Sequence, residues 1–110
     1  MEIVRNNIIP FKGYKCVNLF GILFVRDDAV IGSVDINHES IHTAQMKEML
    51  YVFFYLWYGI EWLVRLVQYR NAHTAYRNIG FEREAYMNQG SMGYLQGRGR
   101  YAWVKYLKKG

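Results

Sequence analysis

The stretch NHESIHTAQMKEML, residues 37–50, marks the point where the character of the chain changes. Before it the chain is rich in β-branched and aromatic residues, whereas residues 44–50 are all helix formers, and neither proline nor glycine follows until Gly59. This pattern predicts a helix that begins near His38, with Asp35 or Asn37 as its N-cap. An N-terminal sheet followed by helices is the α+β class.

The segment YKCVNLFGILFVR, residues 14–26, is apolar at both alternating sets of positions, which predicts a strand buried on both faces. A break at residues 10–13, which holds the only proline, separates it from an earlier strand that ends near Ile9. Residues 27–28 form a predicted tight turn, after which residues 29–36 alternate and are expected to pair back as a hairpin. The N-terminal third therefore predicts a short antiparallel β-sheet.

Two further helices are expected after the first. Residues Met49 to Val67 are apolar almost all around, and their charges, Glu61 and Arg65, have the spacing of a helical ion pair. Residues 76–95 form the third predicted helix. The expected architecture is thus a single domain over residues 1–110, in which a short sheet precedes three helices.

The composition excludes several classes of protein. Of the 110 residues, 52% are hydrophobic and 17% aromatic, which excludes a disordered tail or linker. The single cysteine, Cys16, excludes an internal disulfide framework and a cysteine-based zinc finger. The first ten residues lack the basic segment and apolar core of a secretory signal, so a cytoplasmic location, with possible membrane association, is expected.

The residues His38, Glu39 and His42 form an H-E-x-x-H motif at the start of the predicted helix. Residues four apart lie one turn above each other, so the two imidazoles can bind one metal ion. Zinc lowers the pKa of a bound water, and the neighbouring carboxylate of Glu39 can take its proton. The motif therefore predicts a zinc site in which Glu39 is the general base.

A catalytic zinc ion bound by two histidines needs a third protein ligand and an open position. The candidates are Glu48, His73, Glu82 and Glu84. Glu48 lies where the metzincin pattern H-E-x-x-H-x-x-G-x-x-H has its last ligand, but Gln45 replaces the glycine that turns the chain there. Glu48 is therefore expected to stay on the helix and point elsewhere.

Glu82 and Glu84 lie two positions apart, so on a helix they point about 200° apart and only one can face the metal. Glu82 has a separate explanation, because an acid in the first turn after Gly80 interacts favourably with the helix dipole. Glu84 has none, and the small residue Ala85 beside it allows close approach of the two helices. Glu84 is therefore the expected third ligand.

An H-E-x-x-H motif followed on a later helix by a glutamate in an E-A context resembles the gluzincins, the thermolysin-like zinc metallopeptidases, especially their short single-domain members. The wider pattern of NHESIHTAQ, an aromatic apolar helix and YRNIGFEREAY also resembles a group of small bacterial proteins. The resemblance implies a zincin-like fold with His38, His42 and Glu84 as ligands and Glu39 as general base. It also implies that an edge strand within residues 14–26 binds an extended peptide.

The leading hypothesis is thus a zinc-dependent peptidase acting on a peptide or protein. Gluzincins stabilise the oxyanion with a tyrosine or histidine, and no motif chooses among Tyr76, Tyr86 and His73 for that task. The alternative is a catalytically inactive zinc-binding or membrane-associated scaffold. The two hypotheses make different predictions for Glu39, because a structural zinc site needs no general base.

The aromatic helix, Met49 to Val67, carries more apolar surface than a chain of this size can cover. It predicts a homodimer, contact with a membrane interface, or contact with a larger protein. Its uncharged stretch, residues 49–60, is shorter than the roughly 20 residues of a spanning helix. Residues 70–110 hold eight basic and two acidic side chains, but nucleic-acid binding through them is not the expected function.

Overall fold

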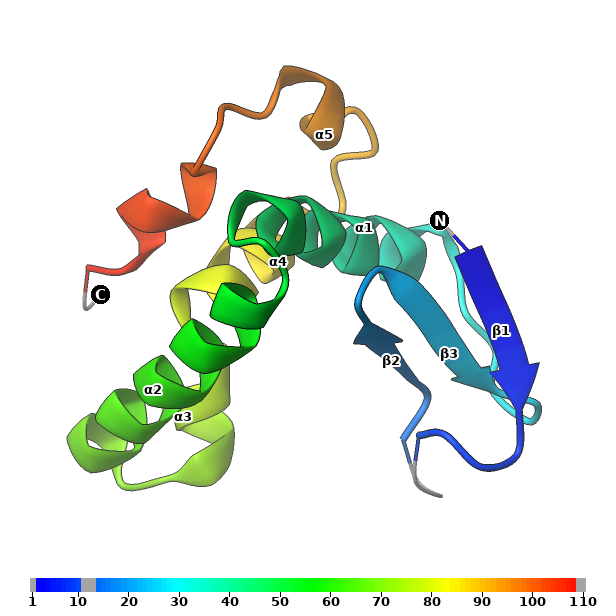
Figure 1. Cartoon of the computed structure of the whole chain (residues 1–110), viewed down its shortest axis with the longest axis horizontal. Helices are drawn as coiled ribbons and strands as arrows, with labels where there is room; N and C mark the ends of the chain where they lie inside the picture. The colour runs from blue at the N-terminus through cyan, green and yellow to red at the C-terminus, as the bar shows by residue number, and fades with distance from the viewer. Residues whose placement is uncertain (1, 11–13, 109–110) are drawn as a thin grey trace.

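The structure, a computed structural model, describes residues 2–10 and 14–108, and in it a small sheet precedes a set of helices (Figure 1). The sheet consists of β1 (Glu2–Asn6), β2 (Cys16–Leu19) and β3 (Ile22–Arg26), in the order β1-β3-β2. β2 and β3 form an antiparallel hairpin, whereas β1 pairs with β3 in parallel. The predicted α+β class is confirmed, but the sheet is mixed and not purely antiparallel.

The hairpin turns at Phe20 and Gly21, in the middle of the segment that was predicted to be one strand. Both residues have positive φ, 54° and 90°, as a two-residue type I′ hairpin turn requires. The side chain of Asn18 accepts a hydrogen bond from the Gly21 N–H at 3.0 Å. The predictions of a single strand over 14–26 and of a returning strand over 29–36 are therefore wrong. A run that is apolar on both faces hides the turn, and only Gly21 signals it.

Helix α1 (Ser33–Glu48) begins five residues before the predicted start. Its N-cap is Gly32, and Asp35 in the first turn accepts a hydrogen bond from the Gly32 N–H at 3.0 Å. Lys15 of the N-terminal segment pairs with the same carboxylate at 3.1 Å. Asp35 thus stabilises the helix start from within the helix, which places the H-E-x-x-H motif in its second and third turns.

A sharp break follows α1, where Leu50 and Tyr51 both have positive φ, 53° and 60°. The Tyr51 N–H returns to the carbonyl of Met46 at 2.8 Å, which ends the helix. The chain then enters α2 (Val52–Tyr69). In place of the single helix predicted over 76–95, shorter elements follow: α3 (Ala72–Arg77), α4 (Gly80–Asn88), α5 (Tyr94–Gly97) and the 3₁₀ helix η1 (Ala102–Tyr106).

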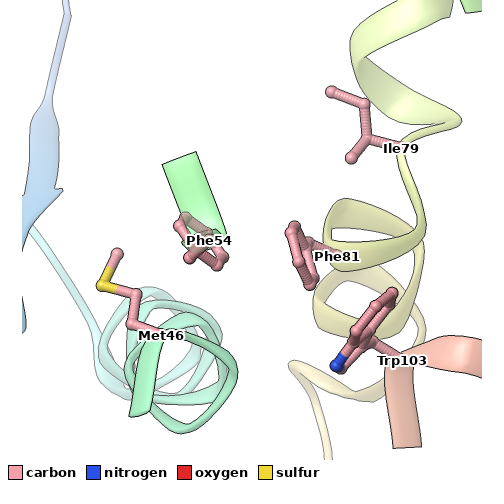
Figure 2. Packing of buried hydrophobic residues seen from close by; sticks show 5 residues of the cluster. All are labelled: Met46, Phe54, Ile79, Phe81 and Trp103. Carbon is pink, nitrogen blue, oxygen red and sulfur yellow. The ribbon is translucent and has the colours of Figure 1, made fainter. Parts of the chain in front are cut away.

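Five buried side chains form the apolar cluster that joins these helices (Figure 2): Met46, Phe54, Ile79, Phe81 and Trp103. Phe54 of α2 stacks on Phe81 of α4 with ring centroids 4.5 Å apart, and Trp103 of η1 packs on Phe81 at 4.7 Å. Phe81 is thus buried between α2 and the C-terminal segment. This packing sets the rotation of α4 about its own axis and so decides which of its side chains face α1.

Helix α2 buries both of its charged residues and exposes many of its apolar ones. Glu61 and Arg65 are buried and paired with each other at 3.1 Å. Within the described residues no single helix is long and apolar enough to cross a membrane. The pair formed by α1 and α2, bent by 109° at the break between them, passes the same test of length and composition.

Candidate metal centre

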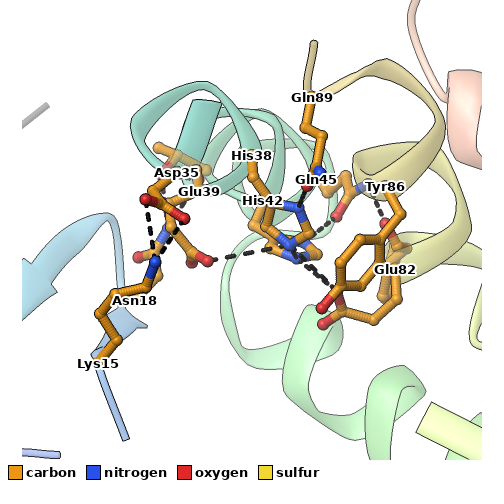
Figure 3. A network of polar contacts seen from close by, with 12 residues as sticks. Lys15, Asn18, Asp35, His38, Glu39, His42, Gln45, Glu82, Tyr86 and Gln89 are labelled. Atoms are coloured by element: carbon orange, nitrogen blue, oxygen red, sulfur yellow. Dashed lines mark hydrogen bonds and ion pairs between the residues drawn. The ribbon is translucent and has the colours of Figure 1, made fainter. Parts of the chain in front are cut away.

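The two histidines of the motif lie on α1 with their rings one above the other, as the i, i+4 spacing predicts (Figure 3). Both are buried, and their Nε2 atoms are 3.2 Å apart. One ligand atom each from His38, Glu39 and His42 lies within 4.8 Å of the other two, so this group can hold a metal ion. At this separation either one ring N–H donates to the other nitrogen, or both nitrogens can share a metal ion.

Glu82, in the first turn of α4, is the third residue of this site. Its Oε1 lies 3.0 Å from Nε2 of His42 and 3.3 Å from Nε2 of His38. The three atoms form a triangle with sides of 3.0–3.3 Å. Ligands bound at about 2.0–2.1 Å in a tetrahedral site are about 3.3–3.4 Å apart. The donor set and its spacing therefore fit a small tetrahedral metal ion.

The structure places the carboxylate of Glu84, the expected third ligand, against Arg98 and Tyr94. The Glu84 carboxylate is completely buried, and it accepts hydrogen bonds from Arg98 Nε at 2.5 Å, Arg98 Nη2 at 3.0 Å and the Tyr94 hydroxyl at 2.5 Å. These interactions account for its burial without a metal. Because Phe81 is fixed in the core, Glu82 faces α1 and Glu84 faces the C-terminal segment.

Glu84 nevertheless contributes to the site through Gln45. The Gln45 amide nitrogen donates to Glu84 Oε1 at 2.9 Å and to the Phe81 carbonyl at 3.0 Å, so the amide oxygen is the atom that faces His42. His42 Nδ1 lies 2.8 Å from that oxygen. Since a carbonyl oxygen only accepts, Nδ1 carries the proton, as in many metal-binding histidines whose second nitrogen is hydrogen-bonded.

The other members of the site are oriented in the same way. His38 Nδ1 lies 2.8 Å from Oε1 of Gln89, the residue that follows α4. The Tyr58 hydroxyl of α2 donates to Glu82 Oε2 at 2.7 Å, which leaves Oε1 for the histidines. The ring of Tyr86 packs edge-on against His38 at 4.5 Å. Each ring and carboxylate therefore has a defined direction before any metal is bound.

The electrostatics of the site favour a positive charge at its centre. Burial by itself lowers the pKa of His42, but the charge of Glu82 and the hydrogen bond to it outweigh burial and raise that pKa to about 9. Burial by itself raises the pKa of Glu82, but the charge of His42 holds that pKa well below its usual range. A proton or a metal ion can supply the charge.

Glu39 lies beside the histidines, with one carboxylate oxygen 3.9 Å from His38 Nε2 and its side chain 19% exposed. Burial raises the pKa of Glu39, an effect that the charges of His42 and His38 partly oppose. A carboxylate with a raised pKa accepts protons more readily than an ordinary one. Its position fits a general base, because it reaches both the histidines and the solvent-facing side of the site.

Two hollows in the surface meet at Glu39. The first, of about 320 Å³, lies between β2 and α2 and is lined mainly by apolar and aromatic side chains, together with Glu39, His42, Tyr76 and Glu82. The second, of about 200 Å³, is more polar, and Lys15, Asp35, His38 and Gln89 line it with Glu39 and Tyr76. His42 and Glu82 line only the first hollow and His38 only the second, whereas Glu39 borders both.

The remaining candidates lie elsewhere. The Glu48 carboxylate binds Arg98 at 3.0 Å and accepts from the Tyr101 N–H at 2.6 Å. His73 is exposed on α3, with its ring 6.0 Å from that of Tyr76. Tyr76 lines both hollows, and its hydroxyl lies 2.8 Å from that of Tyr86.

Sequence reasoning named Glu82 as a candidate but preferred Glu84, although a signal in favour of Glu82 was present. Glu82, Tyr86 and Gln89 are spaced i, i+4, i+7, which places them on one helix face, and all three contact the histidines. Glu84 shares no such face. Gln45 lies three residues after His42 on the same helix, so the sequence could also have predicted it as a hydrogen-bond partner of the His42 ring.

Comparisons with protein-family models, with curated proteins and with solved structures find no match for this chain.

Proposed function

We propose that this protein is a zinc-dependent hydrolase that cleaves peptide bonds, with His38, His42 and Glu82 holding the ion and Glu39 acting as general base. The observation that carries the proposal is the triangle of Nε2, Nε2 and Oε1 atoms, with sides of 3.0–3.3 Å, next to a carboxylate at the edge of two hollows. The gluzincin-like motif in the sequence is consistent with it.

Zinc is the ion that best fits these ligands. Two imidazole nitrogens and one carboxylate oxygen form a set common in catalytic zinc sites, in which the fourth position stays open for water or substrate. When bound, zinc acts as a Lewis acid that polarises a carbonyl group and makes water more acidic. The remaining chemistry belongs to side chains of this chain.

Glu39 has the central part in that chemistry. Its carboxylate takes a proton from the attacking water and returns it to the amine that leaves when the peptide bond breaks. Burial keeps its pKa above the ordinary value, which suits a group that must both accept and donate a proton. The hollows on either side give room for the chain on each side of the scissile bond.

Tyr76 is the best-placed donor for the oxyanion that forms during peptide-bond cleavage. It lines both hollows together with Glu39. Burial, followed by the charge of Glu82, raises the pKa of Tyr76, so its hydroxyl keeps its proton at neutral pH and can donate. Tyr86 packs against His38 and lines only the second hollow, and exposed His73 lines neither.

A second candidate is a structural zinc site without catalysis. The bond between His42 and Glu82 joins α1 to α4, and an ion held there would fasten these two helices together. Glu39 distinguishes the two functions, because a structural site does not use its carboxylate. Peptide cleavage that depends on Glu39 is expected only of the enzyme.

The test combines metal content with activity. Purified protein is expected to contain about one zinc ion per chain by elemental analysis, and His38→Ala/His42→Ala none. Glu39→Gln should keep its zinc and lose at least 100-fold in the cleavage rate of a fluorogenic peptide library, as expected for loss of a general base. Exposed Glu2→Gln serves as the matched control. Absence of zinc, or full activity of Glu39→Gln, would contradict the proposed enzyme.

A further inference from the structure

The outward side of α2 is a continuous apolar surface, which we call the α2 face. Its members are all at least 40% exposed: Val52, Phe53, Leu56, Trp57, Ile60, Leu63, Val64 and Val67. At 100° per residue they cover an arc of about 140°, and at 1.5 Å per residue they extend over about 22 Å. Buried Phe54, Glu61 and Arg65 occupy the opposite side of the helix.

A water-facing helix exposes its charged residues and buries its apolar ones, and α2 does the opposite. Its only charged residues, Glu61 and Arg65, point inward, where Glu61 also accepts from the Gly80 N–H at 3.0 Å and from Trp57 Nε1 at 3.1 Å. Eight exposed apolar side chains without a charge among them are costly to leave in water. The α2 face therefore has an apolar partner.

The chemistry of that partner follows from the charges around the face. Between residues 40 and 108, all of which the structure describes, the four acidic side chains are paired and at most 12% exposed. The exposed charges of this stretch are all basic: Lys47, Arg70, Arg77, Arg100, Lys105 and Lys108.

Three of these cations belong to segments that adjoin the α2 face. Lys47 lies in the last turn of α1, before the break that leads into α2, and Arg70 directly follows α2. Lys105 is in η1, whose Trp103 ring lies 5.4 Å from that of Trp57. An apolar face next to cations alone complements a surface with an apolar interior and negative headgroups.

We infer that the α2 face docks on the surface of an anionic lipid bilayer, with α2 lying in the plane of the interface. A second copy of the chain fits less well, because contact through this face would bring the cations of both copies together, and residues 40–108 offer no exposed acid to neutralise them. Nucleic acid would use the cations but leave Leu56, Ile60 and Leu63 in water. The metal site faces the opposite side of α2, where Tyr58 reaches Glu82.

The test measures binding to lipid vesicles by flotation, with vesicles of phosphatidylcholine alone and of phosphatidylcholine mixed with phosphatidylglycerol. Wild-type protein is expected to bind the anionic vesicles at least tenfold more tightly. Leu56→Glu/Leu63→Glu should lose more than tenfold, because two charges would enter the apolar layer. The control, Ile8→Glu/Val30→Glu, changes two apolar residues outside the helices that are even more exposed, and should bind as the wild type.

A second variant tests the cations. Arg70→Gln/Lys105→Gln should weaken binding to anionic vesicles by about fivefold for each cation removed, and added salt should reduce the difference. Circular dichroism and thermal melting of every variant verify that it folds.

Three results would overturn the inference. The first is failure of the folded wild-type protein to bind either vesicle, and the second is equal affinity for both. The third is a combination of two observations. Analytical ultracentrifugation shows a wild-type dimer that Leu56→Glu/Leu63→Glu dissociates, and the wild-type protein does not bind vesicles. Each outcome is independent of the metal, because vesicle binding is expected to be the same with and without a chelator.

Discussion

At the scale of single residues, Glu82 and Glu84 show how two similar side chains acquire different tasks. Glu82 lies within 3.3 Å of both histidine Nε2 atoms, whereas Glu84 neutralises Arg98 and holds Gln45. Both are buried carboxylates on one short helix. Their neighbours, and not their type, decide which one can bind a metal.

Substitution of these two glutamates should separate metal binding from stability. Glu82→Ala is expected to lower zinc affinity by more than about 100-fold, since residues that only orient a ligand typically cost 10- to 100-fold. Glu84→Ala should lower the free energy of unfolding of the metal-free protein by about 3 kcal/mol, because buried Arg98 loses a partner. Chelator competition and urea denaturation measure the two quantities. Equal zinc affinities of Glu82→Ala and Glu84→Ala would contradict the assignment of Glu82 as a ligand.

Cys16 reports on the charge of Glu39. Burial, then the charges of Glu39 and Asp35, raise the pKa of the half-buried Cys16 thiol to about 11. Only the thiolate is a nucleophile, so alkylation by iodoacetamide at pH 7.5 should be roughly 100-fold slower than for the urea-unfolded chain. The rate should keep rising with pH up to about 11. Glu39→Gln removes one negative charge and should speed the reaction; a slower reaction would contradict this account.

At the scale of elements, the break between α1 and α2 decides the arrangement of the helices. Leu50 and Tyr51 have positive φ, a conformation that is unfavourable for residues with a side chain and easy for glycine. The break allows α2 to turn away from α1 by 109° and to place Tyr58 on Glu82. A continuous helix through this point would leave the metal centre without that contact.

Glycine at the break should therefore stabilise the protein. Leu50 is 71% exposed, so Leu50→Gly loses little packing, and relief of the left-handed conformation is expected to add about 0.5–1 kcal/mol to the free energy of unfolding. Leu56→Gly is the control, a second exposed leucine that lies inside α2, and should cost about 1 kcal/mol. Urea denaturation gives both values, and destabilisation by Leu50→Gly would refute the proposed strain.

At the scale of the whole molecule, the metal centre lies where the main helices meet. The histidines come from α1, Glu82 from α4 and Tyr58 from α2, and the same three helices share the Phe54 and Phe81 cluster (Figures 2 and 3). An ion bound at this junction joins elements that are separated in the chain. If the proposed site binds its ion, metal binding and folding are coupled.

Zinc should stabilise the whole fold. At a free zinc concentration 100 times the Kd, the free energy of unfolding is expected to rise by about 2.7 kcal/mol, and addition of a chelator should reverse the gain. Thermal melting with and without zinc measures the change. Glu82→Ala should show little or none of it, whereas Glu2→Ala should show all of it. An unchanged melting temperature of the wild type in saturating zinc would argue against a site at this junction.

The features that the sequence predicted correctly depend on local spacing. The H-E-x-x-H motif places two imidazoles on one helix face wherever that helix packs, and the uncharged run of α2 predicts an apolar surface. The α+β class follows from the change of residue types near residue 37. The turn at Gly21 was hidden because both strands around it are apolar on both faces, so the alternation that reveals a strand end was missing.

Tertiary structure alone decided the third member of the site. Its identity depends on the rotation of α4 about its axis, which is set by the burial of Phe81 against Phe54 and Trp103. Arg98, whose pairing explains Glu84, lies 14 residues further along the chain. No local pattern contains that contact, because packing between distant elements determines it. The sequence thus determined which residues are able to bind a metal, and packing determined which of them come together.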